Sequence, residues 1–315
     1  MENSLKEKES GFKMRFRRTD IYKNWGRYIL VLPAVFFIIV FAYVPMIGII
    51  MAFENYDPIA GLFHSEWVGI ENFKFFFKGS SSLSVTVNTL YLNAMFIVTG
   101  TIASLFIAVI LCEIKKGAFL KISQTLMTLP NFISWATVAL FSVAFLSSDG
   151  IINRLAELVG KHFDFSTDPG VWPITFIFIR IWKGAGWGAI IYMAAILGID
   201  SEIYEAAKID GINKIKSIFY ITLPLIKGII VLLFILSIGG IFRGDFGMIY
   251  PFIGDNALLF PTTDVIDTMV YRAVRTQTNY GKTTAIGLYQ SVMGFALVIF
   301  ANFMAKRYAP DSAIF

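Results

Sequence analysis

Long runs of uncharged, apolar residues constrain this chain more than any other feature. Four runs of at least 23 residues contain no charged side chain: residues 28–53, 89–112, 124–146 and 283–305. Two further apolar runs contain only one or two charges: residues 173–199, with Arg180 and Lys183, and residues 223–242, with Lys227. A helix needs about 20 apolar residues to cross the hydrocarbon core of a bilayer. The sequence therefore predicts an all-α, polytopic membrane protein with six transmembrane helices.

The distribution of positive charge predicts the orientation of these spans. The 27 Lys and Arg include eight within residues 1–27, and sixteen fall on the same side of the alternating spans as that basic tail. Lys and Arg concentrate on the cytoplasmic side of membrane proteins, so we expect both termini to be cytoplasmic. A basic tail next to a bilayer is typical of contact with anionic lipid, so no nucleic-acid partner is expected. The first run is too long for a signal-peptide core, which predicts an uncleaved first span.

The order of these segments predicts a division of the chain. We expect a basic cytoplasmic tail (residues 1–27), a first span with an outer aromatic segment (28–83), a five-helix core (84–306) and a cytoplasmic C-terminal tail (307–315). In the outer segment, Trp67 and the three phenylalanines at 75–77 are typical of an aromatic belt at the membrane interface. The Gly-Ser run at 79–82 indicates a flexible joint before the core.

Three features predict irregularities within the core. Pro130 predicts a kink in the third span, which neighbouring helices can tolerate. Residues 153–158 predict a short outer helix. Apolar residues at helical spacing between 265 and 273 predict a helix that lies on, or dips into, the outer membrane surface.

Metal, disulfide and nucleotide chemistry have little support in the sequence. Cys112 is the only cysteine, and the two histidines, His64 and His162, fall far apart in predicted outer loops. A disulfide framework is therefore excluded and a metal centre is not expected. The chain also lacks the Gly-x-x-x-x-Gly-Lys-Ser/Thr phosphate loop, so it is not expected to be an enzyme that hydrolyses ATP.

The polar segment at residues 200–224, between spans four and five, predicts two short helices on the cytoplasmic side. Asp200 or Ser201 is a suitable N-cap for a helix that contains Glu205, Ala206 and Ala207. Gly211 can end that helix by adopting a positive φ, and a second short helix is expected over residues 213–220, before Pro224 opens the next span. An E-A-A tripeptide alone is more typical of an ordinary amphipathic loop.

The complete pattern in this segment is much more specific. E-A-A, three residues, G, nine residues and I-x-L-P are met at every fixed position, at Glu205–Ala207, Gly211 and residues 221–224. In this respect the chain resembles the permease subunits of ABC-type importers. Ile-Asp-Gly at 209–211 is similar to the carbohydrate-uptake branch, as are residues 129–135, 181–188 and 264–272, and the likeness covers about residues 26–315. One departure is Ile212, where Ala is commoner, at a position expected only to pack.

The resemblance implies a function and a set of partners. The chain would be the permease of an ATP-driven, binding-protein-dependent importer of oligosaccharides in the bacterial inner membrane. Its partners would be a second homologous permease, two cytoplasmic ATPases that hold ATP and magnesium, and an extracellular or periplasmic sugar-binding protein. The residues implied to couple it to the ATPase are Glu205, Ala206, Ala207, Asp210, Gly211, Ile221, Leu223 and Pro224.

Charged and aromatic side chains within the spans are candidates for the substrate path. Arg180 and Lys183 share a helix face near mid-membrane, where a charge costs on the order of 3 kcal/mol and must face protein or water. They either line the passage, which would favour an anionic sugar, or form an internal ion pair with a residue such as Asp245, or reach toward the interface. Further candidates, which are equally compatible with packing or loop roles, are Trp135, Trp187, Tyr192, Arg243 and Asp245.

Two other hypotheses remain open at this level. An ion-gradient-driven transporter would need carboxylates within its spans, and the six apolar cores contain none. A membrane scaffold that only anchors a cytoplasmic protein would leave the charges of the fourth span without a role. Small-residue spacing at Gly184-x-x-x-Gly188 and Gly240-x-x-x-Gly244 predicts close helix packing.

Overall fold

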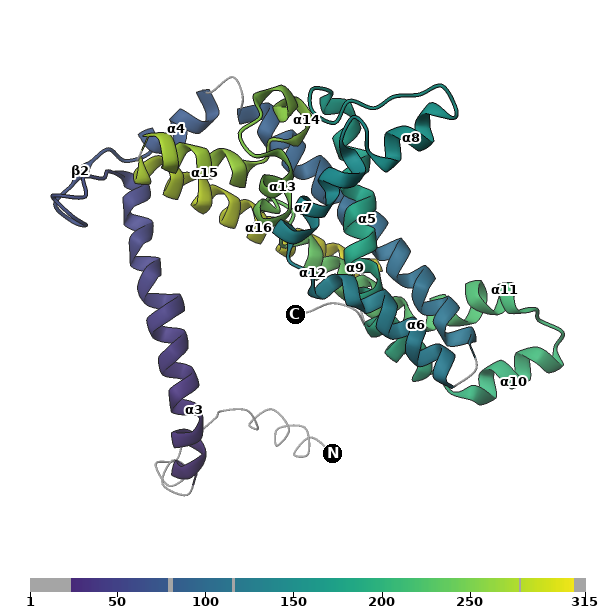
Figure 1. Ribbon diagram of the computed structural model, residues 1–315. Coiled ribbons are helices and arrows are strands. Elements are labelled where there is room, and N and C mark those ends of the chain that lie inside the picture. Colours follow the sequence, from purple (N-terminus) through teal and green to yellow (C-terminus); the bar gives the residue numbers. More distant parts are fainter. Residues whose placement is uncertain (1–23, 79–81, 115–116, 278, 309–315) are drawn as a thin grey trace, which may run out of the picture. The chain divides into compact units, whose positions relative to one another are not determined.

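The computed structural model describes residues 24–78, 82–114, 117–277 and 279–308, which are almost entirely helical (Figure 1). They belong to two compact units, one ending at Ile50 and the other beginning at Met51. Six helical stretches are long and apolar enough to cross a membrane: Trp25–Phe53, Ser82–Glu113, Trp135–Glu157, Pro169–Leu197, Lys214–Ile238 and Tyr280–Met304. The predicted fold class and number of spans are confirmed.

The first unit is a single apolar helical stretch. It begins with α3 (Trp25–Ile38), widens into the π-turn η1 (Ile39–Tyr43) and tightens into the 3₁₀ segment η2 (Val44–Phe53), which runs into the second unit. Apolar residues surround α3 and none of its side chains is buried within the described protein. A helix that is hydrophobic all round is typical of a membrane span.

The segment after this span belongs to the second unit. Strand β1 (Glu54–Asn55) pairs antiparallel with β2 (Glu66–Trp67), and α4 (Glu71–Lys78) follows. Phe76 of α4 is only 2% exposed and packs against Ile286 and Tyr289. This phenylalanine of the expected aromatic belt therefore faces protein, whereas Trp67 is exposed and stacks on Phe53 at 5.6 Å. The boundary predicted near residue 84 falls inside the next helix, and the structure divides the chain at residue 51.

Helices α5 (Ser82–Glu113) and α9 (Trp172–Leu197) lie side by side at the centre of the second unit (Figure 1). A Cβ on Gly188 would lie 2.4 Å from Ser104 Oγ, so this glycine allows the two helices to approach closely. Its predicted companion Gly184 faces open space, and the second close contact is instead at Gly186, where a Cβ would lie 1.9 Å from the carbonyl oxygen of Met127.

The third span is interrupted rather than kinked. Helix α6 (Ala118–Thr128) continues as the 3₁₀ turn η3 (Leu129–Phe132), and α7 (Trp135–Leu146) follows after two extended residues. Pro130 is the second residue of the 3₁₀ turn, and the break comes after the turn, at Ile133 and Ser134. Ser134 Oγ accepts from the Thr137 N–H at 3.1 Å and so caps the new helix. The expected kink at Pro130 is thus replaced by a helix end and a new start.

A short outer helix, α8 (Ile151–Glu157), lies close to the predicted position. The amide of Asn153 bonds to the backbone at Ser147 and Phe163 and holds the loop around it. The 3₁₀ turn η4 (Pro169–Val171) then leads into α9.

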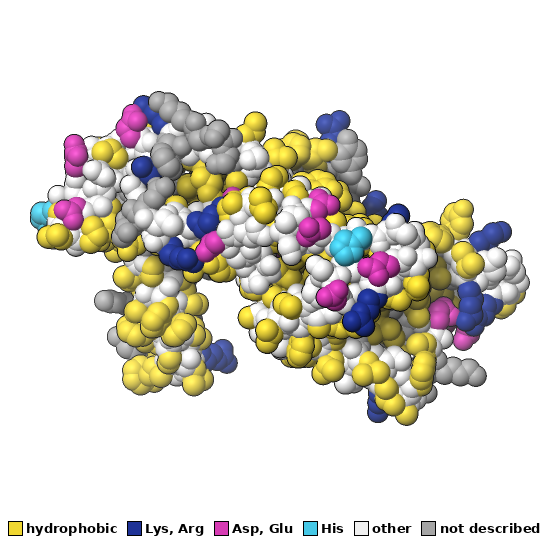
Figure 2. Space-filling view, turned by 45° about the horizontal axis from the view of Figure 1, so that its top comes forward, with side chains coloured by type: hydrophobic (Ala, Val, Ile, Leu, Met, Phe, Trp, Pro, Cys, Tyr) yellow, Lys and Arg dark blue, Asp and Glu magenta, His cyan; other side chains and the backbone are white. Residues whose placement is uncertain are grey.

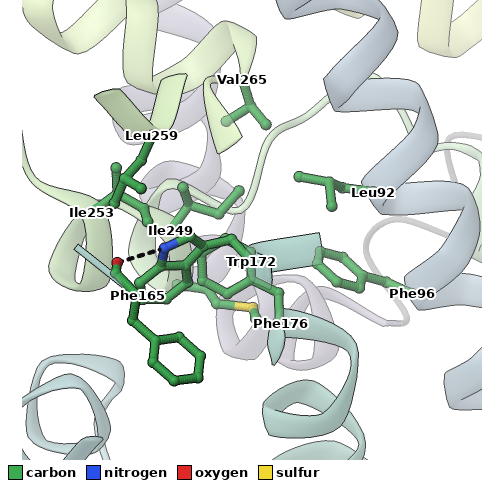
Figure 3. Packing of buried hydrophobic residues seen from close by; sticks show 10 residues of the cluster. Leu92, Phe96, Phe165, Trp172, Phe176, Ile249, Ile253, Leu259 and Val265 are labelled. Carbon is green, nitrogen blue, oxygen red and sulfur yellow. Dashed lines mark hydrogen bonds between the residues drawn. The ribbon is translucent and has the colours of Figure 1, made fainter. Parts of the chain in front are cut away.

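The segment between spans five and six folds into the protein, not only onto its surface. It contains α13 (Phe246–Ile253), η6 (Ala257–Leu259), α14 (Phe260–Thr263) and α15 (Ile266–Gln277), followed by α16 (Tyr280–Tyr308). Figure 3 shows Ile249, Ile253 and Val265 packed with residues of α5 and α9, where Trp172 Nε1 donates to the Phe165 carbonyl oxygen at 3.0 Å. The apolar face of α15 also packs on protein, because Ile266 is fully buried and Met269 and Val270 pack around it.

Candidate functional site

A polar cavity of about 650 Å³ lies among α5, α9, α12 (Leu223–Ile238) and the connection that follows α12. Four of the seven predicted path residues line it: Arg180, Tyr192, Arg243 and Asp245. Its other polar side chains come from Asn93, Thr101, Ser104 and Ser237. Polar groups are expensive in the interior of a membrane protein unless they face water, protein partners or a ligand. This cavity is therefore the candidate substrate path.

Arg180 and Asp245 form an ion pair across the cavity wall. Arg180 Nη1 donates to Asp245 Oδ2, and its guanidinium lies 4.8 Å from the centre of the Phe96 ring. The other oxygen of Asp245, Oδ1, accepts from the Met248 N–H at 3.1 Å and caps α13. Asp245 thus joins the middle of α9 to the start of α13. Of the alternatives for Arg180, an internal ion pair and a cavity-lining role are both present in the structure.

Arg243 supplies the second cation of the cavity. It makes no salt bridge within residues 24–308 as far as these are described. Its backbone is fixed by Asn93, whose amide donates to the carbonyl oxygens of Ile241 and Arg243 at 3.0 and 2.9 Å. The lining side chains therefore carry two positive charges against the one negative charge of Asp245, and the cavity has a positive excess.

Behind the part of the cavity wall that contains Arg243, Asp267 of α15 holds the connection after α12 in place. Its Oδ2 accepts from the Gly244 N–H and from Gln290 Nε2, which is 2.9 Å away. Burial raises the pKa of the Asp267 carboxyl, and these hydrogen bonds partly oppose that shift. A Cβ on Gly244 would lie 2.5 Å from Val265 Cγ2, so the predicted close packing occurs at Gly244, while Gly240 has only an ordinary contact at 3.7 Å.

The other three predicted path residues, Lys183, Trp135 and Trp187, are not among the residues that line this cavity. Lys183 is only 7% exposed, and its ammonium donates to the Asn131 carbonyl oxygen at 2.7 Å and, more weakly, to that of Pro130 at 3.4 Å. It also lies 5.0 Å from the centre of the Trp135 ring. Carbonyl groups at a helix end lack intrahelical partners and attract cations, so Lys183 stabilises the interruption of span three. Trp187 makes an edge contact with Phe132 at 6.0 Å.

The sequence analysis missed the cavity residues of span two. Asn93, Thr101 and Ser104 are eight and three residues apart, which places them on one helix face. Polar residues recurring at that spacing within an apolar run were the available signal.

At the opposite end of the second unit, residues 200–222 form a polar elbow, by which we mean α10 (Ser201–Ile209), α11 (Lys214–Ser217) and the turn between them (Figure 1). Asp200 caps α10 by accepting from the Glu202 N–H at 3.0 Å, as predicted. Gly211 ends it with φ +75°. The Gly211 N–H donates to the Lys208 carbonyl and the Ile212 N–H to the Ala207 carbonyl, which is the Schellman motif. Ile212 is half-buried beside Ala207, as the packing role expected for it requires.

The elbow continues without a break into the fifth span. After α11 the π-turn η5 (Ile218–Thr222) connects directly to α12, so residues 214–238 form one helical rod. The Leu223 N–H donates to the Ile218 carbonyl, five residues back. This wider turn accommodates Pro224, which has no N–H to donate. Pro224 lies in the first turn of α12, as predicted for the start of this span, and the π-turn before it joins the span to α11 without a break.

The two faces of α10 differ in exposure. Glu205 and Ala206 are exposed together with Asp210, while Ala207 is only 6% exposed and faces the protein. Within the described residues Glu205 makes no salt bridge. Figure 2 shows charged side chains of both signs gathered at the end where α10 and α11 lie, next to broad hydrophobic surfaces. Of the remaining predicted coupling residues, Ile221 and Leu223 are half-buried and Pro224 is exposed.

Comparison with known proteins relates the chain as a whole to transport proteins. Residues 23–310 match the family described as "Binding-protein-dependent transport system inner membrane component". The chain is 36% identical over 283 residues to the protein LplB of Bacillus subtilis, covering 89% of this chain and 88% of that one. It is also 36% identical over 286 residues to the polygalacturonan/rhamnogalacturonan transport system permease protein YteP of Bacillus subtilis, with coverage of 90% and 88%. A solved chain of a bacterial alginate ABC transporter, in complex with a periplasmic protein bound to alginate pentasaccharide, matches with a TM-score of 0.83 and 32% identity, covering 92% of this chain and 97% of that one.

Proposed function

This chain belongs to the binding-protein-dependent transport system inner membrane component family, and we propose that it imports acidic oligosaccharides by alternating access, driven through α10 by a partner ATPase. It is a multi-pass inner-membrane permease subunit of an ABC importer for sugars or polysaccharide fragments, and ATP hydrolysis belongs to a separate subunit. Family membership favours this function over an ion-gradient-driven transporter or a scaffold.

The polar cavity is the observation that carries the proposal. A space of about 650 Å³ within an otherwise apolar bundle is large enough for sugar rings, and its hydroxyl, amide and guanidinium groups can replace the hydrogen bonds that a sugar makes with water. Arg243 makes no salt bridge in the described part of the chain, although the charge of Asp267 behind it acts on it, and Arg180 carries a second positive charge. A substrate carboxylate would complete this charge balance. The names of the polygalacturonan/rhamnogalacturonan permease and of the alginate transporter, whose substrates are acidic polysaccharides, support the same substrate class for this chain.

The exposed face of α10 supports the coupling assignment. Glu205 is free to pair with a basic residue, and Ala206 presents only a methyl group, which lets another backbone approach closely. Gly211 forms the turn of the elbow, and Asp210 beside it is exposed. The half-buried residues Ile221 and Leu223 lie where the elbow joins the fifth span, next to the exposed Pro224. We assign this surface to a groove on the ATPase, which holds ATP and magnesium, and both termini of the permease to the same cytoplasmic side.

The complete importer would contain this permease, a second homologous permease, two ATPases and a sugar-binding protein outside the membrane. Closure of the ATPase dimer on ATP would displace α10 and open the cavity outward, so that the binding protein releases sugar into it. Hydrolysis would then reopen the cavity to the cytoplasm. This cycle requires that α10 transmit force without contacting the sugar.

Reconstitution of the complex in liposomes with its binding protein tests this function. Wild-type complex should couple ATP hydrolysis to uptake of an acidic oligosaccharide, and Glu205→Ala should lose most of this coupling. Gly211→Val should do the same, because Val tolerates φ +75° poorly. Glu202→Ala, a neighbouring exposed glutamate of α10, is the matched control. Full uptake by the Glu205 and Gly211 variants would refute the coupling assignment, and a wild-type complex that takes up no sugar would refute the function.

A further inference from the structure

One side-chain contact joins the two arms of the polar elbow. The Tyr204 and Thr222 hydroxyls are hydrogen-bonded, with 3.0 Å between Oη and Oγ1. Tyr204 is half-buried on the inner side of α10, next to Ala207, and Thr222 is only 4% exposed in the π-turn at the foot of α12. The contact thus connects the face of α10 opposite Glu205 to the rod of residues 214–238.

This contact matters because the covalent connection between the arms is short but bendable. Residues 210–213 join α10 to α11 through Gly211 in a left-handed conformation, and glycine changes its dihedral angles at little cost. A force applied to α10 would therefore be absorbed at this turn if the turn were the only connection. The hydrogen bond between Tyr204 and Thr222, which are 18 residues apart in the sequence, is a second connection between α10 and the rod. With both connections in place, α10 and the rod move as one body.

The rod reaches the cavity at its other end. Leu233, Leu236 and Ser237 line the cavity, and Arg243 and Asp245 follow in the connection after α12. From Thr222 to Ser237 the rod rises by roughly 22 Å, at 1.5 Å per residue. A tilt of the rod at Thr222 would consequently shift Ser237 in the cavity wall, and with it the charged residues Arg243 and Asp245 that follow.

The other polar tie at the elbow is less suited to this role. Lys214 Nζ lies 2.5 Å from Glu113 Oε2 at the end of α5, but the two side chains are 74% and 46% exposed. Exposed ion pairs contribute little because water screens them. This pair also begins at α11 and so bypasses α10. A groove of about 360 Å³ lies between α10 and the ends of α5 and α9, so the packing there leaves α10 room to move unless a direct bond holds it.

We propose that Tyr204 and Thr222 are positioning residues for transport, and that their hydrogen bond is the strut that transfers the displacement of α10 to the wall of the sugar cavity. The proposal rests on the proposed function, since it assumes that an ATPase moves α10. It assigns to the inner face of α10 a role separate from the docking role of Glu205 and Ala206. Loss of this hydrogen bond should leave the docking of the ATPase intact, but less sugar should be transported for each ATP hydrolysed.

The test measures sugar transported per ATP hydrolysed by the complete complex in liposomes. Tyr204→Phe and Thr222→Val each remove one hydroxyl with little change of shape, and each should lower this ratio about fivefold, the scale of one lost neutral hydrogen bond. The double variant should be no worse than either single variant, because both remove the same bond. Thr222→Ser keeps the hydroxyl and should restore the ratio. Tyr91→Phe, at an exposed tyrosine of α5, is the control for loss of a phenol hydroxyl.

Two results would overturn the strut. One is a ratio within twofold of wild type in both single variants, and the other is an additive loss in the double variant. Co-purification of the ATPase is scored on the same preparations. An ATPase that binds the Tyr204→Phe complex as well as wild type, together with a reduced ratio, supports the strut. If the wild-type protein binds no ATPase, the proposed function fails, and that failure is recognised separately.

Discussion

Arg180 and Lys183 are one turn apart on α9, yet one faces the polar cavity and the other faces the interruption of span three. Arg180 reaches the polar cavity, where its partner Asp245 comes from the connection after span five. Lys183 is buried against the interruption of span three, where its partners are backbone carbonyl groups. What faces a buried cation, rather than the cation itself, decides whether it belongs to a path or to the scaffold. The pair therefore offers a direct comparison between transport and stability within one helix.

The largest effect is expected from Lys183→Met, which keeps the length of the side chain and removes its donors. The Asn131 carbonyl would lose its ammonium donor, and the end of η3 would lose its cation. We expect the free energy of unfolding in detergent to fall by about 2–3 kcal/mol. Lys227→Met, at an exposed position of α12, is the control. Uptake per folded complex should remain near wild type, and a Lys183 variant that folds normally but transports poorly would return this residue to the substrate path.

Arg180→Gln should give the reverse pattern, with a smaller effect on folding. Asp245 would keep its capping bond to Met248 but lose its ion pair, and the cavity would lose one positive charge. Uptake of an acidic oligosaccharide should fall roughly tenfold, equivalent to about 1.4 kcal/mol, at nearly unchanged expression. Adding Asp245→Asn removes the unpaired carboxylate, so the double variant should recover stability but not acidic-sugar uptake. If the double variant regains full uptake, the pair only holds α9 and α13 together.

Arg243→Gln should affect the substrate alone. This side chain has no salt bridge to lose in the described structure, so the thermal midpoint should not change. The KM for an acidic oligosaccharide should rise about threefold, because a screened, partly exposed charge contributes modestly. The same oligosaccharide with its carboxyl groups reduced should show no change. Arg154→Gln, in the outer helix α8, provides a matched loss of charge. Equal effects on both sugars would show that Arg243 does not recognise the carboxylate.

The polar elbow and the cavity also differ in how well the sequence predicts them. The N-cap at Asp200 and the left-handed Gly211 are local signals, since each acts within a few residues, and both are confirmed. Pro224 lies in the first turn of α12 as predicted, but the π-turn that joins this helix to α11 was not predicted. The helix boundaries themselves follow from hydropathy, which is why all six spans were found.

The cavity depends on contacts that no local pattern contains. Asn93 holds the backbone of residues 148 and 150 positions away, and Arg180 meets a carboxylate 65 residues away. Which of the alternatives holds for Lys183 could not be read from the sequence for the same reason. Its partners lie at the end of η3, about 50 residues earlier, and the break that exposes those carbonyls was itself predicted only as a kink.

The smallest effect is expected at Asp267, which lies behind the Arg243 side of the cavity. Burial raises the pKa of this carboxyl, so its charged form is less favourable in the folded than in the unfolded protein. That cost is present above the raised pKa and disappears as the pH falls through it. Asp267→Asn keeps an oxygen that can accept from Gly244 and Gln290 but carries no charge. At neutral pH it should unfold about 1–2 °C above wild type, and the difference should shrink as the pH approaches the ordinary aspartate value of 3.8.

Asp264→Asn provides a comparison for Asp267→Asn. The Asp264 carboxylate is buried, lies 2.5 Å from the Arg272 guanidinium and accepts a hydrogen bond from the Thr268 hydroxyl. Removing its charge leaves the guanidinium with a weaker partner, so this variant should unfold below wild type at neutral pH. The two substitutions, only three residues apart, should therefore change the unfolding temperature in opposite directions. As with Arg180 and Lys183, the groups that surround each charge would decide its effect. Destabilisation by Asp267→Asn at neutral pH would mean that the Asp267 charge, rather than its hydrogen bonds, fixes the Gly244 side of the cavity.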